Sequence, residues 1–339
     1  MTSRKKFIKQ SAAFIAGGAF GFNRLLNAAN IATEINLNKA KLFKGFVDHT
    51  TDFQQNFSDQ LFIQSDNGWE ITSIHSKKKI KKRVVTIIHT NDFHSRFEPF
   101  EPQNNRWGNQ GGIARMKDLI DQERQIDPNL FLFDCGDVFQ GTPYFNIFKG
   151  HLELEWMKKA GYDATTIGNH DFDLGIDHLF QIRKQYNMPT VNCNYILEDE
   201  WKQQDLIQPF KIIEKNGIKL GIIGVGIELT GLLSETSYKG LTYSDPIECV
   251  QKSANHLKLE EKCDMIIVLS HLGYKYNNNK IDDLKLAANT YNIDAILGGH
   301  THTFLDEPTM IKNSKEQNII VNQAGWAGLR LGKLVFSLK

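Results

Sequence analysis

The stretch VVTIIHTNDFH, Val84 to His94, joins a buried strand to residues that can bind a metal ion. Its first part, Val84 to Ile88, is almost entirely apolar, which is typical of a strand covered on both faces of a sheet. Asp92 and His94 follow this strand closely. Since residues two apart in an extended chain point to the same side, both side chains can enter one crevice beyond the strand end.

Short apolar runs like this one recur along the chain. They predict further strands at 130–133, 164–167, 220–225, 265–269, 295–297, 319–321 and 331–336. Segments with apolar residues at i, i+3 and i+4 predict helices at 113–125, 151–159, 177–186, 247–261 and 281–291. This alternation predicts an α/β fold in which helices cover a sheet.

The composition fits a globular chain whose specificity comes from a local site. Of 339 residues, 41% are hydrophobic, which is enough for one large α/β layer or two domains. A net charge of +1 gives no overall field toward nucleic acid, so we expect no nucleic-acid partner. The four cysteines are scattered without a C-x-x-C pair, which argues against a disulfide framework or a thiolate zinc site.

The first 83 residues lack this alternation of predicted strands and helices. Within 1–30, a basic start and an apolar stretch from Ser11 to Phe22 predict an export signal and a periplasmic or cell-envelope location. The start resembles the twin-arginine pattern S-R-R-x-F-L-K, with Lys5 in place of the second arginine. A surface helix is the alternative, and the apolar stretch is too short for a stable membrane span. Residues 31–83 show no sustained period and end in a basic run, so we expect a poorly ordered lead.

Five of the predicted strands are followed by residues that bind hard or borderline metals. These residues are Asp92 and His94, Asp137, Asn169 with His170, His271, and His300 with His302. Because ligands of open α/β sheets bind beyond the carboxyl ends of the strands, the five loops are expected to converge on one crevice. Carboxylate, amide and imidazole groups without thiolate suit Zn, Mn, Fe or Co, and two such ions can share the site.

Five sequence blocks around these residues resemble the motifs of the calcineurin-like metallophosphoesterases. The blocks are VTIIHTNDFHS at 85–95, GDVFQGTP at 136–143, GNHDFD at 168–173, SHLG at 270–273 and GHTH at 299–302. They are most similar to the branch of 5'-nucleotidases, UDP-sugar hydrolases and cyclic-nucleotide phosphodiesterases. The resemblance implies that residues 84–339 form a metallophosphoesterase domain, a four-layer α/β/β/α sandwich.

The resemblance also implies roles for the site residues. It assigns two divalent ions to ligand sets that share Asp137: Asp92, His94, Asp137 and His302, and Asp137, Asn169, His271 and His300. His170 would stabilise the transition state or protonate the leaving oxygen, Asp173 would orient it, and Asn169 would join His170 at the substrate phosphate. Asp171 stands where this branch usually has Glu, and we expect little from that change.

These assignments predict a hydrolase of phosphate esters, with nucleotides as the expected substrates. In such a site, hydroxide shared by the two ions attacks the phosphorus in line. One alternative is a phosphodiesterase for cyclic or non-nucleotide esters, because the motifs specify the phosphoryl chemistry and leave the leaving group open. Another is a catalytic subunit that needs a separate substrate-binding chain, because the nucleotidases carry a C-terminal domain and this sequence stops at Lys339 before one.

Overall fold

The computed structural model describes residues 46–48, 60–73 and 83–338. All of them belong to one compact unit, residues 42–339. The predicted export signal at 1–30 therefore lies outside the described residues, as does much of the predicted lead.

The strands form two halves of one long sheet. The first half contains, side by side, β17 (Arg330–Ser337), β4 (Val84–Thr90), β5 (Phe131–Asp134), β6 (Ala164–Thr165), β7 (Thr190–Val191) and β9 (Ile207–Gln208). The second half contains β10 (Phe210–Lys215), β11 (Ile218–Gly226), β13 (Met265–His271), β14 (Ala295–Gly298), β16 (Asn318–Gln323) and β15 (Thr309–Lys312). Pairing is parallel from β4 to β9 and from β11 to β16. Consequently, the carboxyl ends of these strands lie at one edge of each half.

Alternate residues of the central strands enter different hydrophobic cores. Ile87 of β4 packs in the same core as Ile267 and Leu269 of β13, so this core lies between the two halves of the sheet. The neighbouring residues Ile88 and Val268 belong to two further cores that contain helix residues. Because side chains alternate along a strand, each half is covered on both faces.

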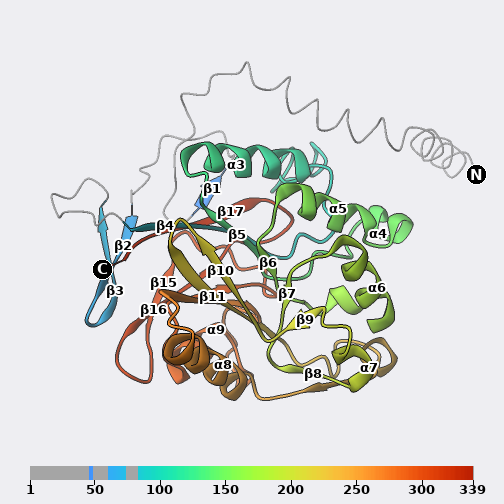
Figure 1. The fold of residues 1–339 in the computed structure, drawn as a ribbon. Coiled ribbons are helices and arrows are strands. Elements are labelled where there is room, and N and C mark those ends of the chain that lie inside the picture. Colours follow the sequence, from blue (N-terminus) through green and yellow to red (C-terminus); the bar gives the residue numbers. More distant parts are fainter. Residues whose placement is uncertain (1–45, 49–59, 74–82, 339) are drawn as a thin grey trace, which may run out of the picture. The chain divides into compact units, whose positions relative to one another are not determined.

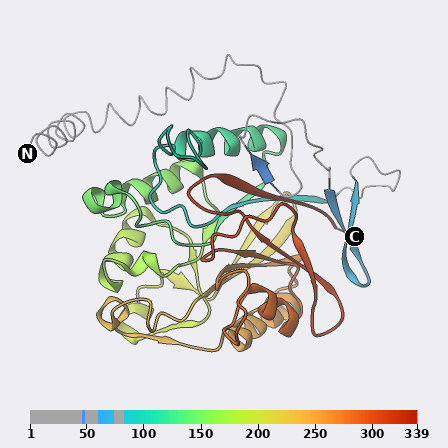
Figure 2. The same ribbon diagram turned by 180° about the vertical axis from the view of Figure 1, so that it is seen from behind.

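Helices supply the two outer layers. The first half is covered by α3 (Ile113–Ile126), α5 (His151–Ala160) and α6 (Ile176–Tyr186), and the second half by α8 (Pro246–Asn255) and α9 (Asp283–Asn289). Figures 1 and 2 show the two groups of helices on opposite sides of the strands. This arrangement confirms the predicted four-layer α/β/β/α sandwich. The predicted helix at 247–261 is α8 followed by one wider π-helical turn, His256–Glu260.

Several short elements lie between these. They are α4 (Pro143–Phe148), α7 (Asp199–Lys202), the 3-10 turns His170–Phe172 and Glu235–Tyr238, and the strand pair β8 (Tyr195–Leu197) and β12 (Leu241–Tyr243). No helix within the described ranges is long and apolar enough to cross a membrane.

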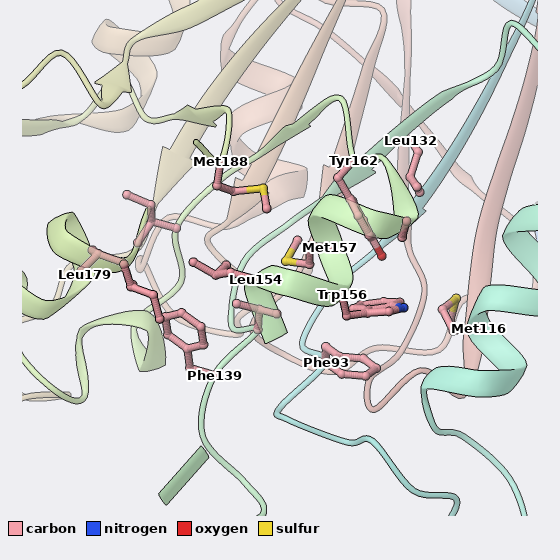
Figure 3. Close-up of a cluster of buried hydrophobic side chains, with 14 of the residues drawn as sticks. Phe93, Met116, Leu132, Phe139, Leu154, Trp156, Met157, Tyr162, Leu179 and Met188 are labelled. Carbon is pink, nitrogen blue, oxygen red and sulfur yellow. The ribbon is translucent and has the colours of Figure 1, made fainter. Parts of the chain in front are cut away.

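The core between the first half and its helices anchors the loop after β4. Phe93 is buried in it and stacks on Trp156 of α5, with ring centroids 4.8 Å apart and planes inclined by 21° (Figure 3). Stacked aromatic pairs stabilise by about 0.5–1.5 kcal/mol beyond the area they bury. Since Phe93 lies between Asp92 and His94, this contact fixes the backbone that carries both.

Part of the predicted lead is ordered, and for that part the prediction of poor order at 31–83 is wrong. Residues of β1 (Phe46–Asp48) pair with β17, and β2 (Gln60–Ser65) and β3 (Gly68–Ser73) form a hairpin. The hairpin pairs with β17 on one side and β16 on the other, so it joins the two halves of the sheet. The physical reason is apolar burial, because Leu61, Phe62 and Trp69 are almost fully buried.

Candidate active site

The five predicted loops meet beyond the strand ends. The loop after β4 brings Asp92 and His94, the loop after β5 brings Asp137, and the loop after β6 brings Asn169 and His170. His271 is the last residue of β13, and His300 and His302 follow β14. The structure therefore brings every sequence-predicted site residue to one place, and Asp173 lies beside His170.

Six side chains form two groups whose ligand atoms lie within 4.8 Å of one another. The groups are Asp92, His94 and His302, and Asp137, His271 and His300. The two groups adjoin, because His94 Nε2 lies 3.9 Å from an oxygen of Asp92 and 3.9 Å from an oxygen of Asp137. Asn169 joins the second group, since its Oδ1 lies 2.9 Å from His300 Nδ1.

The donor atoms fit divalent metal ions. Within the described part of the chain, His271 Nε2 is buried and has no hydrogen-bond partner, although it lies 3.1 Å from Asp137 Oδ2. The other ring nitrogen of His271 is 2.6 Å from the carbonyl oxygen of Cys135. Metal-binding histidines have this pattern, because an outer oxygen fixes the ring and the free nitrogen faces the ion. Buried polar atoms without partners are rare otherwise.

The backbone is strained where it presents these groups. Asp92, His94, Asp137 and His302 have φ between 50° and 56°, in the left-handed region. This conformation costs about 1–3 kcal/mol for each non-glycine residue and persists when the surrounding structure enforces it. Position 168 requires glycine, because the Asp137 side chain lies against its backbone and a Cβ there would be 2.1 Å from Asp137 Oδ1.

Asp171 links two of the site loops. This buried carboxylate accepts hydrogen bonds from the backbone N–H of Val138, at 3.3 Å, and of Gly168, at 2.9 Å. Arg183 of α6, also buried, lies 3.5 Å from it. Asp171 therefore ties the loop carrying Asp137 to the loop carrying Asn169.

The electrostatics favour ionised carboxylates in the site. Burial opposes ionisation of Asp137, but the neighbouring histidines, above all His271, outweigh it and hold its pKa well below the usual range. Burial likewise opposes the charge on His271, but Asp137 and Asp92 raise its pKa to about 10. Burial and repulsion by His271 lower the pKa of His300 to about 4. Two buried carboxylates beside imidazoles are suitable ligands for a divalent cation, and His271 would release its proton when an ion binds.

His170 is placed differently from the metal-type ligands. Its Nδ1 lies 3.2 Å from both carboxylate oxygens of Asp173, and its backbone N–H donates to Asp137 Oδ1 at 2.8 Å. The hydrogen bond with Asp173 raises the pKa of His170, despite the opposing effect of burial. The imidazole is about one third exposed and faces the site cavity, so it can present a proton to a bound molecule.

A cavity of about 310 Å³ opens over these residues. Its lining includes Asn169 and His170, and also Arg96, Gln140 and Trp326, which the sequence analysis missed. Arg96 could have been found, because it lies two residues after His94 in the same loop. Trp326 follows β16 outside the predicted site loops, so nothing in its local sequence indicated its position.

The fold and the site together define the class of protein. Residues 85–304 match the family model described as calcineurin-like phosphoesterase, and the chain belongs to this family. This identification agrees with the resemblance found in the five sequence blocks.

Its relatives include several 5'-nucleotidases. The chain is 33% identical over 269 residues to the snake venom 5'-nucleotidase of Gloydius brevicauda, covering 74% of this chain and 44% of the relative. It is 33% identical over 247 residues to the 5'-nucleotidase of Vibrio cholerae, covering 69% of this chain and 43% of that relative. The structure of a 5'-nucleotidase precursor from Thermus thermophilus superposes with a TM-score of 0.68 at 33% identity, covering 75% of this chain and 51% of that one. The chain thus spans less than half the length of these curated relatives.

Proposed function

We propose that this chain is a dinuclear metal-dependent phosphoesterase that hydrolyses nucleotides in the manner of a 5'-nucleotidase. The observation that supports this most is the meeting of two metal-type ligand groups in one crevice, with His170 beside them. The relatives named 5'-nucleotidase support the choice of nucleotides as substrates.

Two ligand sets sharing Asp137 are assigned to the ions. The first set is Asp92, His94, Asp137 and His302, and the second set is Asp137, Asn169, His271 and His300. Their oxygen and nitrogen donors suit Zn, Mn, Fe or Co. Bound there, two such ions supply charge neutralisation for the phosphoryl oxygens and a nucleophile acidified from water.

His170 and Asp173 form the proton-handling pair. Asp173 engages Nδ1 of His170, which leaves Nε2 as the nitrogen available to a molecule in the cavity. The hydrogen bond with Asp173 raises the pKa of His170 and so shifts the ring toward the imidazolium. That cation stabilises negative charge on the phosphoryl oxygens or gives its proton to the leaving oxygen. Asn169, buried beside His300, holds the phosphate from the same loop.

A substrate panel tests this function. The purified full chain, loaded with Mn²⁺ or Zn²⁺, is assayed with 5'-AMP, 3'-AMP, a UDP-sugar, a cyclic nucleotide and bis(4-nitrophenyl) phosphate. The nucleotidase proposal predicts the highest kcat/KM for 5'-AMP. Preference for the cyclic or the bis(4-nitrophenyl) ester would favour the phosphodiesterase alternative.

A separate substrate-binding chain is the second candidate arrangement. It is motivated by coverage, because this chain spans only 44% and 43% of the length of the two curated 5'-nucleotidases. If such a partner supplies remote binding energy, the chain alone hydrolyses small activated esters but shows a high KM and weak base preference with nucleotides. Sharp selectivity among 5'-nucleotides by the chain alone contradicts the need for a partner.

Export to the periplasm or cell envelope is proposed from residues 1–30. A reporter fused behind this segment should leave the cytoplasm, and the double change Arg4→Gln and Lys5→Gln should stop it. Undiminished export of the double variant would exclude the twin-arginine route.

A further inference from the structure

Two histidines of the ligand groups are held in place by an outer oxygen. The Nδ1 atoms of His94 and His271 lie 3.2 and 2.6 Å from the carbonyl oxygens of Phe139 and Cys135. Among the described residues, no oxygen plays this part for His302, whose Nε2 instead lies 3.0 Å from His94 Nε2 and 3.4 Å from Asp92 Oδ1. Metal-binding histidines usually need such an outer partner to keep the ring in place.

His302 is also more open than His94 and His271. Its side chain is 37% exposed, whereas those of His94 and His271 are 9% and 0% exposed. Gln323 holds the backbone of the loop, because its Oε1 accepts from Thr303 N–H and its Nε2 donates to the carbonyl of Gly299. These bonds fix the main chain of the loop and do not contact the His302 ring.

Trp326 supplies the missing support. Its indole lies parallel to the His302 ring, with planes inclined by 3° and centroids 5.2 Å apart, which is an offset stack. It also meets the edge of His94, with centroids 6.4 Å apart, and Phe100 packs against it at 5.6 Å. Two imidazoles of the same ligand group therefore rest on one indole.

The segment around Trp326 also contacts Asp92, the third residue of the group that contains His94 and His302. The N–H of Ala327 donates to the carbonyl oxygen of Asp92 at 2.8 Å. Asn91 is bound from the same segment, since Ala324 N–H donates to its Oδ1 at 2.9 Å. In the described part of the chain, the ring contacts of Trp326 involve none of Asp137, His271 and His300.

We propose that Trp326 is a positioning residue that holds His302 and His94 in ligand geometry and thereby controls the affinity of the Asp92–His94–His302 site alone. The inference rests on the proposed dinuclear centre. Loss of the stack should let His302 rotate toward solvent, so that one ion is held by fewer ligands while the other site is unchanged. Removing an outer support of a metal ligand typically lowers metal affinity about 10–100-fold.

Calorimetric titration of the metal-free full chain with Co²⁺ tests this proposal. Trp326→Leu removes the ring and keeps an apolar side chain, whereas Trp326→Phe keeps an aromatic ring. Trp107→Leu is the matched control, because Trp107 packs in the same cluster as Trp326 and Phe100 and stacks on Phe304. Among the described residues, its ring contacts involve no ligand histidine. We expect Trp326→Leu to weaken one of the two binding steps about 10–100-fold, Trp326→Phe to weaken it less, and Trp107→Leu to leave both steps unchanged.

Activity at rising Co²⁺ gives a second readout. If Trp326 acts through the ligands, excess metal restores the kcat of Trp326→Leu, and a role in folding alone would not respond in this way. Wild-type affinity at both steps in Trp326→Leu overturns the inference, as does equal weakening of both steps. A wild-type chain that binds no Co²⁺ instead refutes the dinuclear centre itself, so the two failures are distinguishable.

Discussion

Replacing Asp171 by Asn tests whether this buried carboxylate ties the two site loops together. In the wild type, one carboxylate oxygen of Asp171 accepts from Val138 N–H and the other accepts from Gly168 N–H. Asparagine keeps the shape of the side chain but has only one oxygen, so one of these two hydrogen bonds is lost. The new amide N–H then faces a backbone N–H, and the charge of buried Arg183 loses its counterion.

The magnitude follows from these contacts. Removing one partner of a buried ion pair costs about 3–5 kcal/mol. Arg183 keeps two hydrogen bonds at 2.9 Å, to the hydroxyls of Thr165 and Thr190, which places the cost near the lower end, about 3 kcal/mol. For a chain of 339 residues, that corresponds to a fall in Tm of about 4 °C.

Scanning calorimetry of the full chain measures this change. Asp306→Asn is the matched control, because Asp306 pairs with Arg330 at 3.0 Å but is 88% exposed, so its loss costs about 0–1 kcal/mol. Asp171→Glu keeps the charge and adds one methylene to a packed site, so it should be milder than Asp171→Asn. A fall in Tm for Asp171→Asn no larger than for Asp306→Asn would refute the reasoning.

Three further changes test the proton-handling pair and the hairpin. His170→Asn removes the proton donor while keeping the ligands, so kcat should fall about 10²–10⁴-fold with metal content intact; loss of metal, measured by elemental analysis, would contradict this. Asp173→Asn removes the hydrogen bond that raises the pKa of His170, so the alkaline limb of the kcat–pH profile should move to lower pH, and an unmoved limb would argue against the pair. Trp69 is 1% exposed and its ring centroid lies 4.9 Å from that of Phe336, so Trp69→Ala should lower the free energy of unfolding, measured by chemical denaturation, by about 3–5 kcal/mol. Ile71→Ala is the control, because Ile71 is 44% exposed and its loss should change little. An effect of Trp69→Ala as small as that of Ile71→Ala would mean that burial of Trp69 does not stabilise the fold.

The sequence was sufficient for the central strands and for the five loops. Apolar runs such as 265–269 have no polar face and are too short for a typical helix, which favours strands buried on both sides, and the metal-type residues follow their ends. The length of such a run does not specify where hydrogen bonding stops, which is why 164–167 became the two-residue strand β6.

The hairpin of β2 and β3 was missed because its apolar residues are few and a basic run follows them. The turn residues Asp66, Asn67 and Gly68 between Phe62 and Trp69 were the available signal. The contacts of Trp326 and Asp171 lay beyond prediction for another reason. Stacking between residues 302 and 326, and bonds from Asp171 to Val138, depend on tertiary geometry that no local pattern encodes.

In the proposed centre, Asp137 is a ligand of both metal ions. Metal content per chain, measured by elemental analysis on the wild type, Asp137→Ala, His302→Gln and His170→Asn, tests it most directly. We predict two ions in the wild type and in His170→Asn, a partial loss in His302→Gln because an amide oxygen can still bind, and loss of at least one ion with activity in Asp137→Ala. Two ions per chain in Asp137→Ala would contradict the account.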